Sequence, residues 1–522
     1  ELGITIQKGL EMNPELKKMY EMDEDIKKLL DMSMRLEGLP RHTSIHAAGV
    51  VISPEEVDEF VPLSRAADGT ITTQYTMVTL EELGLLKMDF LGLRNLSVIH
   101  DAQEMIRTKV PDFQIENIAL DDPKVFDMLS TGSTDGVFQF ESGGMRSVIM
   151  QLRPERLEDL IAVISLYRPG PMDSIPRYIE CRHHPEKVQF RHPLLRDILD
   201  VTYGCIVYQE QVMQIFRSLA GYSLGRADIV RRAMSKKKAD VMEKERQIFI
   251  YGLVNEDGTV EVDGCIRRGV DEETAKAIFG EMESFASYAF NKSHATAYAL
   301  LAYQTAWLKC YYPQEYMAAL LTSVLDMTNK LSAYIAECIR LGIHVLPPHV
   351  NLSRNGFTVD GKDIRFGLLA IRNLGKGFIS GLLQERDQGG PFTSFYNFCK
   401  RMYGKDLNRR ALESLVKCGA LDNLGYNRRQ MLENVASVLE SLEADKRRNV
   451  DGQLGFFDSL TPRAAEEEFV IGPMADLSMA DKLAMEKEVT GMYLSGHPMA
   501  EYLPAYGQLH AAKTGELLDE DT

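Results

Sequence analysis

Helical and strand periodicities alternate over the first hundred residues. Residues 13–37 carry a helical repeat of apolar positions, and the pair Asn13–Pro14 is typical of an N-cap followed by proline at the first helical position. The stretch HAAGVVISPEE (46–56) then has the glycine turn and β-branched residues of a strand. Residues 69–93 continue this strand character, interrupted by a short helical piece. The pattern predicts a small sheet that follows a helical segment.

A mostly helical pattern runs from about residue 98 to residue 345, and the pattern then changes. GIHVLPPHVNLS (342–353) is a proline-marked crossover, and short strands are expected around residues 356–368, before two compact helical units. Residues 425–470 are polar and turn-rich with one apolar island, which is typical of an exposed, mobile connector. The fold class expected from these patterns is α+β and mainly helical.

One predicted strand carries a charged pair inside an apolar run. LLKMDFLGL (85–93) places Lys87 and Asp89 two positions apart. Residues i and i+2 of a strand point to the same face, so the two side chains should lie side by side. An aspartate at a strand end can bind Mg²⁺, and a neighbouring lysine can offset the charge of a phosphate. An ordinary lysine–aspartate ion pair explains the same spacing.

A basic helix is predicted further along the chain. GYSLGRADIVRRAMSKKK (221–238) places Arg231 and Arg232 on this helix. Three lysines follow at its end: Lys236, Lys237 and Lys238. Arginine forks combined with lysine point charges are well suited to a polyphosphate. Basic residues at a helix C-terminus also fit the helix dipole, so a solvated helix end is the alternative.

A group of polar residues precedes a long apolar helix in YAFNKSHATAYALLAYQTAWLK (288–309). Asn291 and Ser293 suit the N-cap region, where backbone N–H groups would face an anion. His294 belongs to the same group. The surrounding rings offer flat faces on which a base could stack: Tyr288, Phe290 and Tyr298. A capped core helix whose aromatic residues serve packing is the alternative.

AIRNLGKGFISGLLQER (370–386) has the pattern of a helix-hairpin-helix unit. Its hairpin would consist of Leu374, Gly375, Lys376 and Gly377. The N–H groups of such a hairpin can hold a DNA phosphate without reading the base sequence. LNRRALESLVKCGALDNLG (407–425) resembles a second, degenerate copy. Helices joined by a glycine turn for packing alone are the alternative.

The polar connector contains the apolar island QLGFF. Its candidate binding residues are Gln453, Leu454, Phe456 and Phe457. Exposed apolar islands in such segments often dock into a pocket of a partner protein. The alternative is that the two phenylalanines pack back onto their own domain.

The distribution of charge along the chain bears on whether a nucleic acid can be a partner. The net charge of −17 argues against a nucleic-acid partner when it is taken as an average. Residues 226–246, however, contain eight Lys or Arg against four Asp or Glu. A local basic groove on an acidic protein is therefore compatible with the composition.

Several features of the sequence bear on the cellular location of the protein and on whether this chain is part of a longer one. The seven cysteines are scattered without a CxxC pair, which favours a reducing cytoplasm and argues against a zinc ribbon. No signal peptide is visible, and the longest apolar segment (295–308) is interrupted by Gln304, which argues against a membrane span. The chain starts at Glu1 within what looks like mid-domain sequence, so we expect an internal piece of a longer protein.

Six motifs in consistent order carry a family resemblance. They are KMDFLGLRNL, GVFQFESGGMR, LYRPGPM, YGCIVYQEQVMQI, GYSLGRADIVRRAMSKKK and FNKSHATAYALLAYQTAWLK. Together they resemble the bacterial replicative DNA polymerase III alpha subunits, polymerase family C, over nearly the whole chain. The resemblance implies a partial palm sheet of the polymerase beta type, large helical fingers and a tandem helix-hairpin-helix domain. The implied domains are the end of the thumb (1–38), the second part of the palm (39–110), the fingers (111–345) and the clamp-binding domain (346–522).

The resemblance also implies roles for the candidate residues. The family holds two Mg²⁺ ions with three palm aspartates, of which Asp89 matches the third, and Lys87 matches the active-site lysine. The other two aspartates lie in a PDxDxDF-like strand that is absent here, so they are expected upstream of Glu1. Arg231 and Arg232 would hold the incoming triphosphate. Asn291, Ser293 and His294 would line the sugar and base side of the nucleotide pocket.

The implied activity is templated DNA synthesis, in which a primer 3′-hydroxyl attacks the α-phosphate of a deoxynucleoside triphosphate and releases pyrophosphate. The implied partners are primer–template DNA, the beta sliding clamp (bound by Gln453–Phe457), and the proofreading exonuclease and clamp-loader subunits, in the cytoplasm.

Two alternatives from other classes stay open. The first is a non-enzymatic module that binds DNA and tethers a clamp, which the missing carboxylates make plausible for this chain by itself. The second is a metal-dependent phosphoesterase, which requires a dense cluster of His and Asp, whereas the eleven histidines are dispersed.

Overall fold

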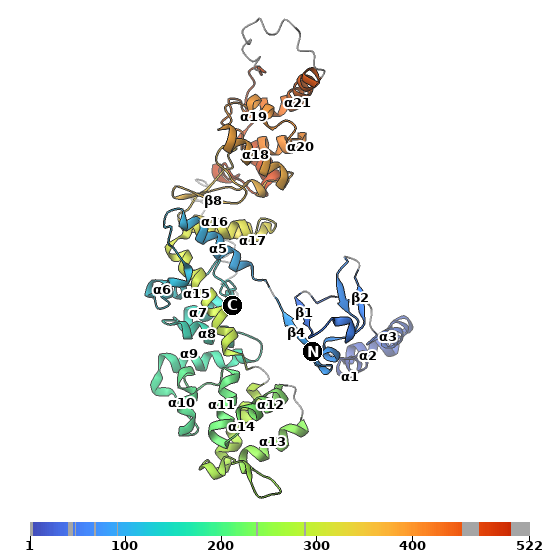
Figure 1. Ribbon diagram of the computed structural model, residues 1–522, viewed down its shortest axis with the longest axis vertical. Coiled ribbons are helices and arrows are strands. Elements are labelled where there is room, and N and C mark those ends of the chain that lie inside the picture. Colours follow the sequence, from blue (N-terminus) through green and yellow to red (C-terminus); the bar gives the residue numbers. More distant parts are fainter. Residues whose placement is uncertain are drawn as a thin grey trace. The chain divides into compact units, whose positions relative to one another are not determined.

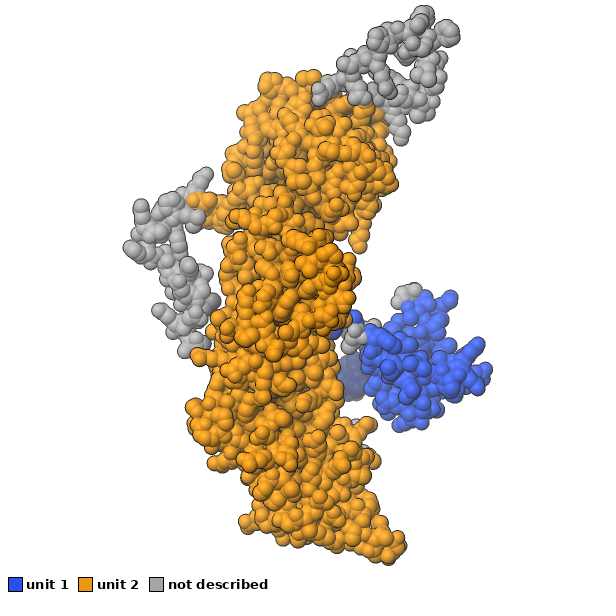
Figure 2. Space-filling model, turned by 60° about the vertical axis from the view of Figure 1, so that its left-hand side comes forward, with its two compact units in different colours: residues 1–93 blue, residues 94–522 orange. Residues whose placement is uncertain are grey.

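The computed structural model describes residues 4–39, 45–46, 48–66, 69–90, 92–235, 239–286, 289–450 and 469–502. The chain forms two compact units, residues 1–93 and residues 94–522, which are coloured separately in Figure 2.

Unit 1 opens with helices and continues with short strands. Its helices come first: α1 (Ile6–Met12), α2 (Pro14–Met22) and α3 (Glu24–Leu36). The Asn13 side chain accepts hydrogen bonds from the Glu15 and Leu16 N–H groups, which confirms the predicted N-cap before Pro14. The remaining elements are β1 (Gly49–Ile52), β2 (Leu63–Arg65), β3 (Ile71–Thr73), α4 (Met77–Glu82) and β4 (Leu86–Asp89).

Two antiparallel strand pairs organise the second half of unit 1. Strand β1 pairs with β4, and β2 pairs with β3. The β1–β4 register sets Gly49 opposite Asp89 and Val51 opposite Lys87. A small core of Val61, Leu80 and Leu85 packs beneath them. The predicted strands and their short helical interruption are confirmed, but the strands form two separate two-stranded sheets instead of one small sheet. The strand pairing decides which residues face Asp89.

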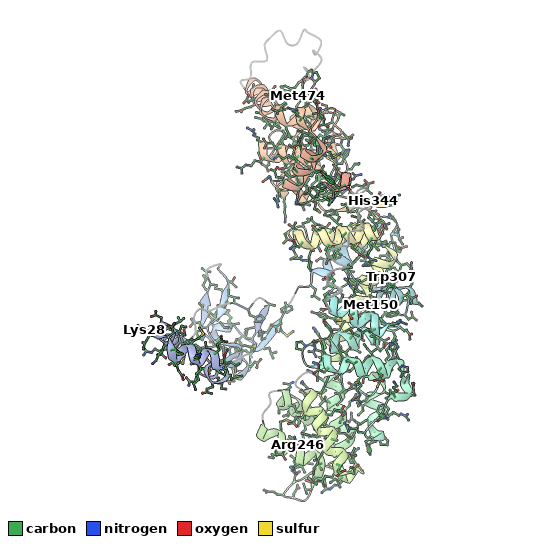
Figure 3. The ribbon with its side chains drawn as sticks, turned by 180° about the vertical axis from the view of Figure 1, so that it is seen from behind. Lys28, Met150, Arg246, Trp307, His344 and Met474 are labelled. Carbon is green, nitrogen blue, oxygen red and sulfur yellow. The ribbon has the colours of Figure 1, made fainter. Side chains whose placement is uncertain are left out.

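Unit 2 is mainly helical, and α15 runs through its first core (Figure 1). This helix packs against α8, α6, α16 and α5. Its Trp307, labelled in Figure 3, stacks with Phe113 and Tyr311 at centroid distances of 5.8 and 4.8 Å. The bounds up to this core are α5 (Arg94–Arg107), α6 (Pro123–Ser130), α7 (Gly143–Leu152), α8 (Leu157–Leu166), α9 (Ile175–His183), α15 (Lys292–Tyr311), α16 (Pro313–Ser323) and α17 (Thr328–Arg340).

A separate core lies between residues 195 and 289. Phe216, Phe249 and Phe279 meet edge-on or tilted within it. Helix α12 packs against α11, α13 and α14 there. The elements are α10 (Arg196–Leu199), α11 (Gln209–Ala220), α12 (Leu224–Ser235), α13 (Ala239–Tyr251), β5 (Leu253–Val254), β6 (Val260–Val262) and α14 (Glu272–Ala286).

The C-terminal part of unit 2 combines a small sheet with helices. The strand order is β7-β9-β8, with β7 parallel and β8 antiparallel to β9. The strands expected around residues 356–368 are therefore confirmed. The elements are β7 (Val345–Leu346), β8 (Thr358–Asp360), β9 (Asp363–Arg365), α18 (Lys376–Gly389), α19 (Phe395–Met402), α20 (Arg409–Lys417), α21 (Arg428–Val450) and α22 (Met479–Thr490).

The expected connector over residues 425–470 is wrong for its first half, because α21 occupies residues 428–450. Apolar residues with spacings of four, three and four line one face of this helix and are buried: Met431, Val435, Val438 and Leu442. The polar residues between them dominate the composition and mask this helical period. Residues 451–468 lie outside the described part of the chain.

At the level of class, the α+β and mainly helical expectation is confirmed, with only small sheets among the described residues. Within the same part of the chain, no helix is both long enough and apolar enough to cross a membrane.

Candidate nucleotide and phosphate sites

The predicted Lys87–Asp89 pair forms at the end of β4. The Lys87 Nζ lies 2.7 Å from the Asp89 Oδ1. The Lys87 side chain is only 16% exposed, whereas that of Asp89 is 48% exposed. The hydrogen bond from Lys87 lowers the pKa of the Asp89 carboxyl below its usual value. Asp89 is therefore an anionic ligand that remains open to solvent, beside a lysine held in place.

Two residues of this site were missed by sequence reasoning: His46 in the turn before β1, and Gly49, the first residue of β1. The His46 Nδ1 accepts a hydrogen bond from the Gly49 N–H at 2.7 Å and lies 3.8 Å from Asp89 Oδ1. Gly49 faces Asp89 in the register, and a Cβ at Gly49 would lie 2.6 Å from the Lys87 Cε. The small-residue turn HAAG was visible in the sequence, but only strand pairing places it at the Lys87–Asp89 pair.

The described residues of this site do not complete a metal centre. No group of three or more His, Cys, Asp or Glu able to hold a metal ion occurs within the described part of the chain. Asp89 supplies one carboxylate, and the nearest histidine nitrogen, Nδ1 of His46, already accepts a backbone N–H. Two ions about 3.5–4 Å apart require several bridging carboxylates. The site therefore does not by itself fit a two-ion centre.

The arginine pair lies on α12 and is anchored by a residue that sequence reasoning did not name. Both guanidinium groups bond to the carboxylate of Asp228, Arg231 through two nitrogens at 3.0 and 2.8 Å and Arg232 through Nε at 2.8 Å. These contacts lower the pKa of Asp228, the hydrogen bond from Arg231 most of all. The Arg232 side chain remains 70% exposed. Lys236, Lys237 and Lys238 lie outside the described residues.

Of the polar residues at the start of α15, Asn291 caps the helix, whereas Ser293 and His294 are exposed. The Asn291 side chain caps the helix by accepting the His294 N–H at 2.8 Å, and its amide donates to Glu210 at 3.1 Å. This confirms the capping part of the prediction. Ser293 is exposed at the same helix end. Asn291 is thus committed to the fold, whereas His294 presents its ring to a cavity.

A cavity of about 740 Å³ opens beside His294. Along one wall the Arg168 guanidinium lies 4.1 Å from the Phe290 ring centroid, and the His294 and Tyr298 rings lie 4.4 Å apart. Burial lowers the pKa of Arg168, which remains a cation at neutral pH. The full lining is Asn95, Phe138, Gln139, Glu141, Ser142, Met145, Ile164, Tyr167, Arg168, Phe290, His294 and Tyr298. Aromatic faces beside a cation suit a nucleotide.

A loop that buried groups hold in place also lines the cavity, and its Phe138 ring lies 5.2 Å from that of Tyr298. The Lys309 Nζ donates to the carbonyl oxygens of Ser133 and Asp135 at 3.0 and 2.6 Å, and the Phe138 N–H donates to Thr305 at 3.1 Å. Gln139 follows with φ of 66°, the left-handed region that side chains disfavour. These anchors keep a strained residue in the lining of the cavity. Gln139 and Arg168 lie in the motifs GVFQFESGGMR and LYRPGPM, but the sequence assigned neither of them a role.

The predicted site residues are thus distributed over distinct places. Within unit 2, His294 lines the cavity and neither Arg231 nor Arg232 does. Asp89 belongs to unit 1. A common cleft of Asp89, the arginine pair and His294 therefore stays a prediction. The clamp-binding residues Gln453, Leu454, Phe456 and Phe457 lie outside the described residues.

The predicted hairpin stands at the start of α18. Gly375 is the N-cap residue without a side-chain cap, and Lys376 and Gly377 are exposed, whereas Leu374 is buried. The preceding helical half is only a 3-10 turn, Leu368–Ala370. The Asn373 amide donates to the Ser414 Oγ at 3.1 Å, so the hairpin is tied to α20, the first helix of the degenerate copy.

Comparison with protein families gives three matches in order along the chain. Residues 1–92 match the family model "Bacterial DNA polymerase III alpha NTPase domain", and residues 95–257 match "Bacterial DNA polymerase III alpha subunit finger domain". Residues 342–431 match "Helix-hairpin-helix motif", as the sequence predicted. The chain belongs to the family of bacterial DNA polymerase III alpha subunits. The exact boundaries of the palm, the fingers and the clamp-binding domain stay predictions.

Curated DNA polymerase III alpha subunits are similar over nearly the whole chain. That of Thermus aquaticus is 47% identical over 95% of this chain. Those of Bacillus subtilis (strain 168) and Escherichia coli (strain K12) are 41% and 40% identical, each over 96% of this chain. The chain spans 40% of the first of these relatives and 43% of each of the other two.

Proposed function

We propose that this chain supplies part of the active centre and the DNA-binding part of a replicative DNA polymerase. The observation that carries the proposal is the solvent-open Asp89 carboxylate beside the sequestered Lys87 ammonium, in a region that matches the DNA polymerase III alpha NTPase domain. A carboxylate and a lysine held side by side suit a reaction whose catalysis rests on positioning and charge.

In this proposal the reaction is nucleotidyl transfer from a deoxynucleoside triphosphate to a primer 3′-hydroxyl. Lys87 neutralises phosphate charge beside Asp89. Arg231 and Arg232 hold the triphosphate as a pair that Asp228 keeps oriented. The base and sugar occupy the cavity at His294, where ring faces and the Arg168 cation are available.

Two Mg²⁺ ions are part of the proposal, with Asp89 as one ligand. The described residues provide no group of three metal-binding side chains around it. In this proposal the other two ligands are the palm aspartates that the family resemblance implies upstream of Glu1. When bound, such ions stabilise the attacking and leaving oxygens of an in-line displacement. Asp89 contributes an anionic oxygen, and Lys87 keeps the pKa of that carboxyl low enough for it to remain ionised.

Duplex DNA is the proposed partner of the C-terminal part. The exposed backbone of Gly375, Lys376 and Gly377 faces a phosphate, as in other helix-hairpin-helix motifs, and Lys236, Lys237 and Lys238 add positive charge elsewhere. The beta sliding clamp, clamp-loader subunits and a proofreading exonuclease are the proposed protein partners, in the cytoplasm.

Primer extension tests the proposal. We expect no templated synthesis from the 522-residue chain alone, because Asp89 by itself cannot hold two ions. The longest natural polypeptide that carries this sequence should extend a primer, and D89N in it should lower the rate by about 10³-fold or more, as expected when a metal-binding charge is lost.

Three other outcomes would contradict the proposal. Synthesis by the chain alone would show that the site is complete without further carboxylates. If the longer polypeptide binds DNA but never extends a primer, a non-enzymatic DNA-binding and clamp-tethering module is correct, which the helix-hairpin-helix match favours. Metal-dependent DNA cleavage that D89N abolishes would indicate a phosphoesterase.

A further inference from the structure

His46 has one ring nitrogen fixed by the fold and the other turned towards Lys87. Its Nδ1 accepts the N–H groups of Gly49 at 2.7 Å and Ala48 at 3.2 Å. A nitrogen that accepts hydrogen bonds carries no proton, so we assign the proton of the neutral ring to Nε2. This tautomer makes the outer nitrogen of His46 a hydrogen-bond donor and prevents it from ligating a metal ion.

The Nε2 donor lies next to a second donor. The Lys87 Nζ is 3.5 Å from Nε2, and an ammonium group has donors only. Lys87 already donates to Asp89 Oδ1 at 2.7 Å, so it offers no acceptor to the ring. Two donors therefore converge on one point, beside a backbone that lacks a Cβ at Gly49. Such a point suits an oxygen that carries negative charge.

We propose that His46 is a substrate-contacting residue whose Nε2–H, together with the Lys87 ammonium, binds one oxygen of the nucleotide's phosphate chain. The His46 side chain is 55% exposed, so a phosphate can reach it. This inference rests on the proposed function, because the phosphate chain is that of the incoming nucleotide or of the pyrophosphate that leaves. It adds a protein donor that the family resemblance did not name.

Two substitutions separate the donor from the structural role of the ring. In H46N, the Asn Oδ1 takes the place of Nδ1 and can accept the Gly49 N–H, but nothing remains at the Nε2 position. In H46A, both groups are lost. A purely structural histidine would be replaced well by asparagine, whereas a phosphate donor would be lost in both variants. H100N, at an exposed histidine on α5, is the matched control.

The first measurement is binding of inorganic tripolyphosphate to the 522-residue chain by calorimetry, in EDTA so that no metal ion mediates binding. We expect H46N and H46A to weaken binding by about tenfold, the order of one charge-assisted hydrogen bond, and H100N to leave it unchanged. Thermal unfolding of H46N should match that of the unsubstituted chain. Equal binding by H46N, or no tripolyphosphate binding by the unsubstituted chain, would overturn the inference.

The second measurement keeps this result separate from the proposed function. In the longest natural polypeptide that carries this sequence, single-nucleotide addition by H46N should show a nucleotide Kd raised by about tenfold. Absence of synthesis without any substitution refutes the proposed function and leaves the tripolyphosphate result to decide the inference. Normal synthesis and an unchanged Kd in H46N would refute the inference alone.

Discussion

Gly49 shows how one missing side chain can set the geometry of a site. A Cβ at this position would lie 2.6 Å from Lys87 Cε, 2.9 Å from His46 Nδ1 and 3.2 Å from Asp89 Oδ1. The atom most crowded is the end of a flexible lysine, which can move at little cost in stability. We therefore expect the contact between Lys87 and Asp89 to be displaced before the fold is disturbed.

The corresponding prediction concerns G49A in the longest natural polypeptide that carries this sequence. The rate of nucleotide addition should fall by about tenfold, because Lys87 leaves Asp89, while the free energy of unfolding of unit 1 changes by about 1 kcal/mol or less. Single-turnover primer extension and thermal unfolding measure the two effects. G9A is the control, since nothing lies within 4 Å of the added Cβ in α1. An unchanged rate in G49A would contradict the prediction.

At the scale of elements, α22 joins the C-terminal domain through a buried ion pair. The Arg428 Nη1 of α21 lies 2.9 Å from the Glu486 Oε1 of α22, and both side chains are buried. Burial raises the pKa of Glu486, but hydrogen bonds from Ser495, from the Leu494 N–H and from Arg428 outweigh it and leave the pKa below its usual value. Glu486 is thus charged and fully partnered at neutral pH.

We predict that E486Q opens α22. The substitution removes the charge of one of two carboxylates bonded to Arg428, since Asp422 remains at 2.9 Å from its Nη2, and we expect a cost of about 2 kcal/mol. Hydrogen exchange of the α22 amides at pH 7 should speed up accordingly. E488Q on the same helix is the control, because its pair with Lys417 is largely exposed, with 59% of the Glu488 side chain accessible.

The stability difference between the unsubstituted chain and E486Q should depend on pH, because folding lowers the pKa of Glu486. A carboxyl whose pKa is lowered by folding stabilises the protein above its unfolded pKa of about 4.3, and this contribution is lost as pH falls through the folded value. The stability difference between the unsubstituted chain and E486Q, measured by hydrogen exchange of the α22 amides, should therefore be largest at neutral pH and shrink below about pH 4. A gap that persists in acid would contradict the assignment of Glu486 as an ionised partner.

Elements also show where sequence patterns are reliable. The helix starts at Asn13 and Asn291 were predicted from local capping chemistry, and the side chain of each caps as expected. Helix α21 was missed because its polar composition outweighed a buried stripe of only four residues. Local signals identified the element ends well, whereas burial of a narrow stripe depends on what packs against it.

At the scale of the whole molecule, the proposed binding sites are distributed over both units and the segment that follows α21. Unit 1 carries the Lys87–Asp89 pair, and unit 2 carries the His294 cavity and the helix-hairpin-helix motif. Residues 453–457 follow α21 in the same chain. Such an arrangement predicts that binding of the sliding clamp and binding of DNA can be separated by substitution.

The test changes Gln453, Phe456 and Phe457 together to alanine. We expect clamp affinity to fall by about 100-fold or more, as for loss of buried aromatic anchors, while DNA affinity changes less than about twofold. Surface plasmon resonance with clamp and with duplex DNA measures both. Alanine at Glu466, Glu467 and Glu468, in the same segment, is the control. Clamp binding that survives the triple substitution would show that another segment is the anchor.

The sequence by itself determined the helical class, the helix caps, the pairing of Lys87 with Asp89 and the family. These follow from local periodicity, from the two-residue repeat of a strand and from motif order, all of which are written along the chain. Only the tertiary structure placed His46 and Gly49 beside Asp89, and Arg168 with Gln139 at the cavity of His294. For the cavity and the Asp89 site, the reason is that strand register and helix packing bring together residues tens to more than a hundred positions apart. Asp228 is a local case, because it lies three and four positions before its arginines on one helix, a spacing that is written along the chain.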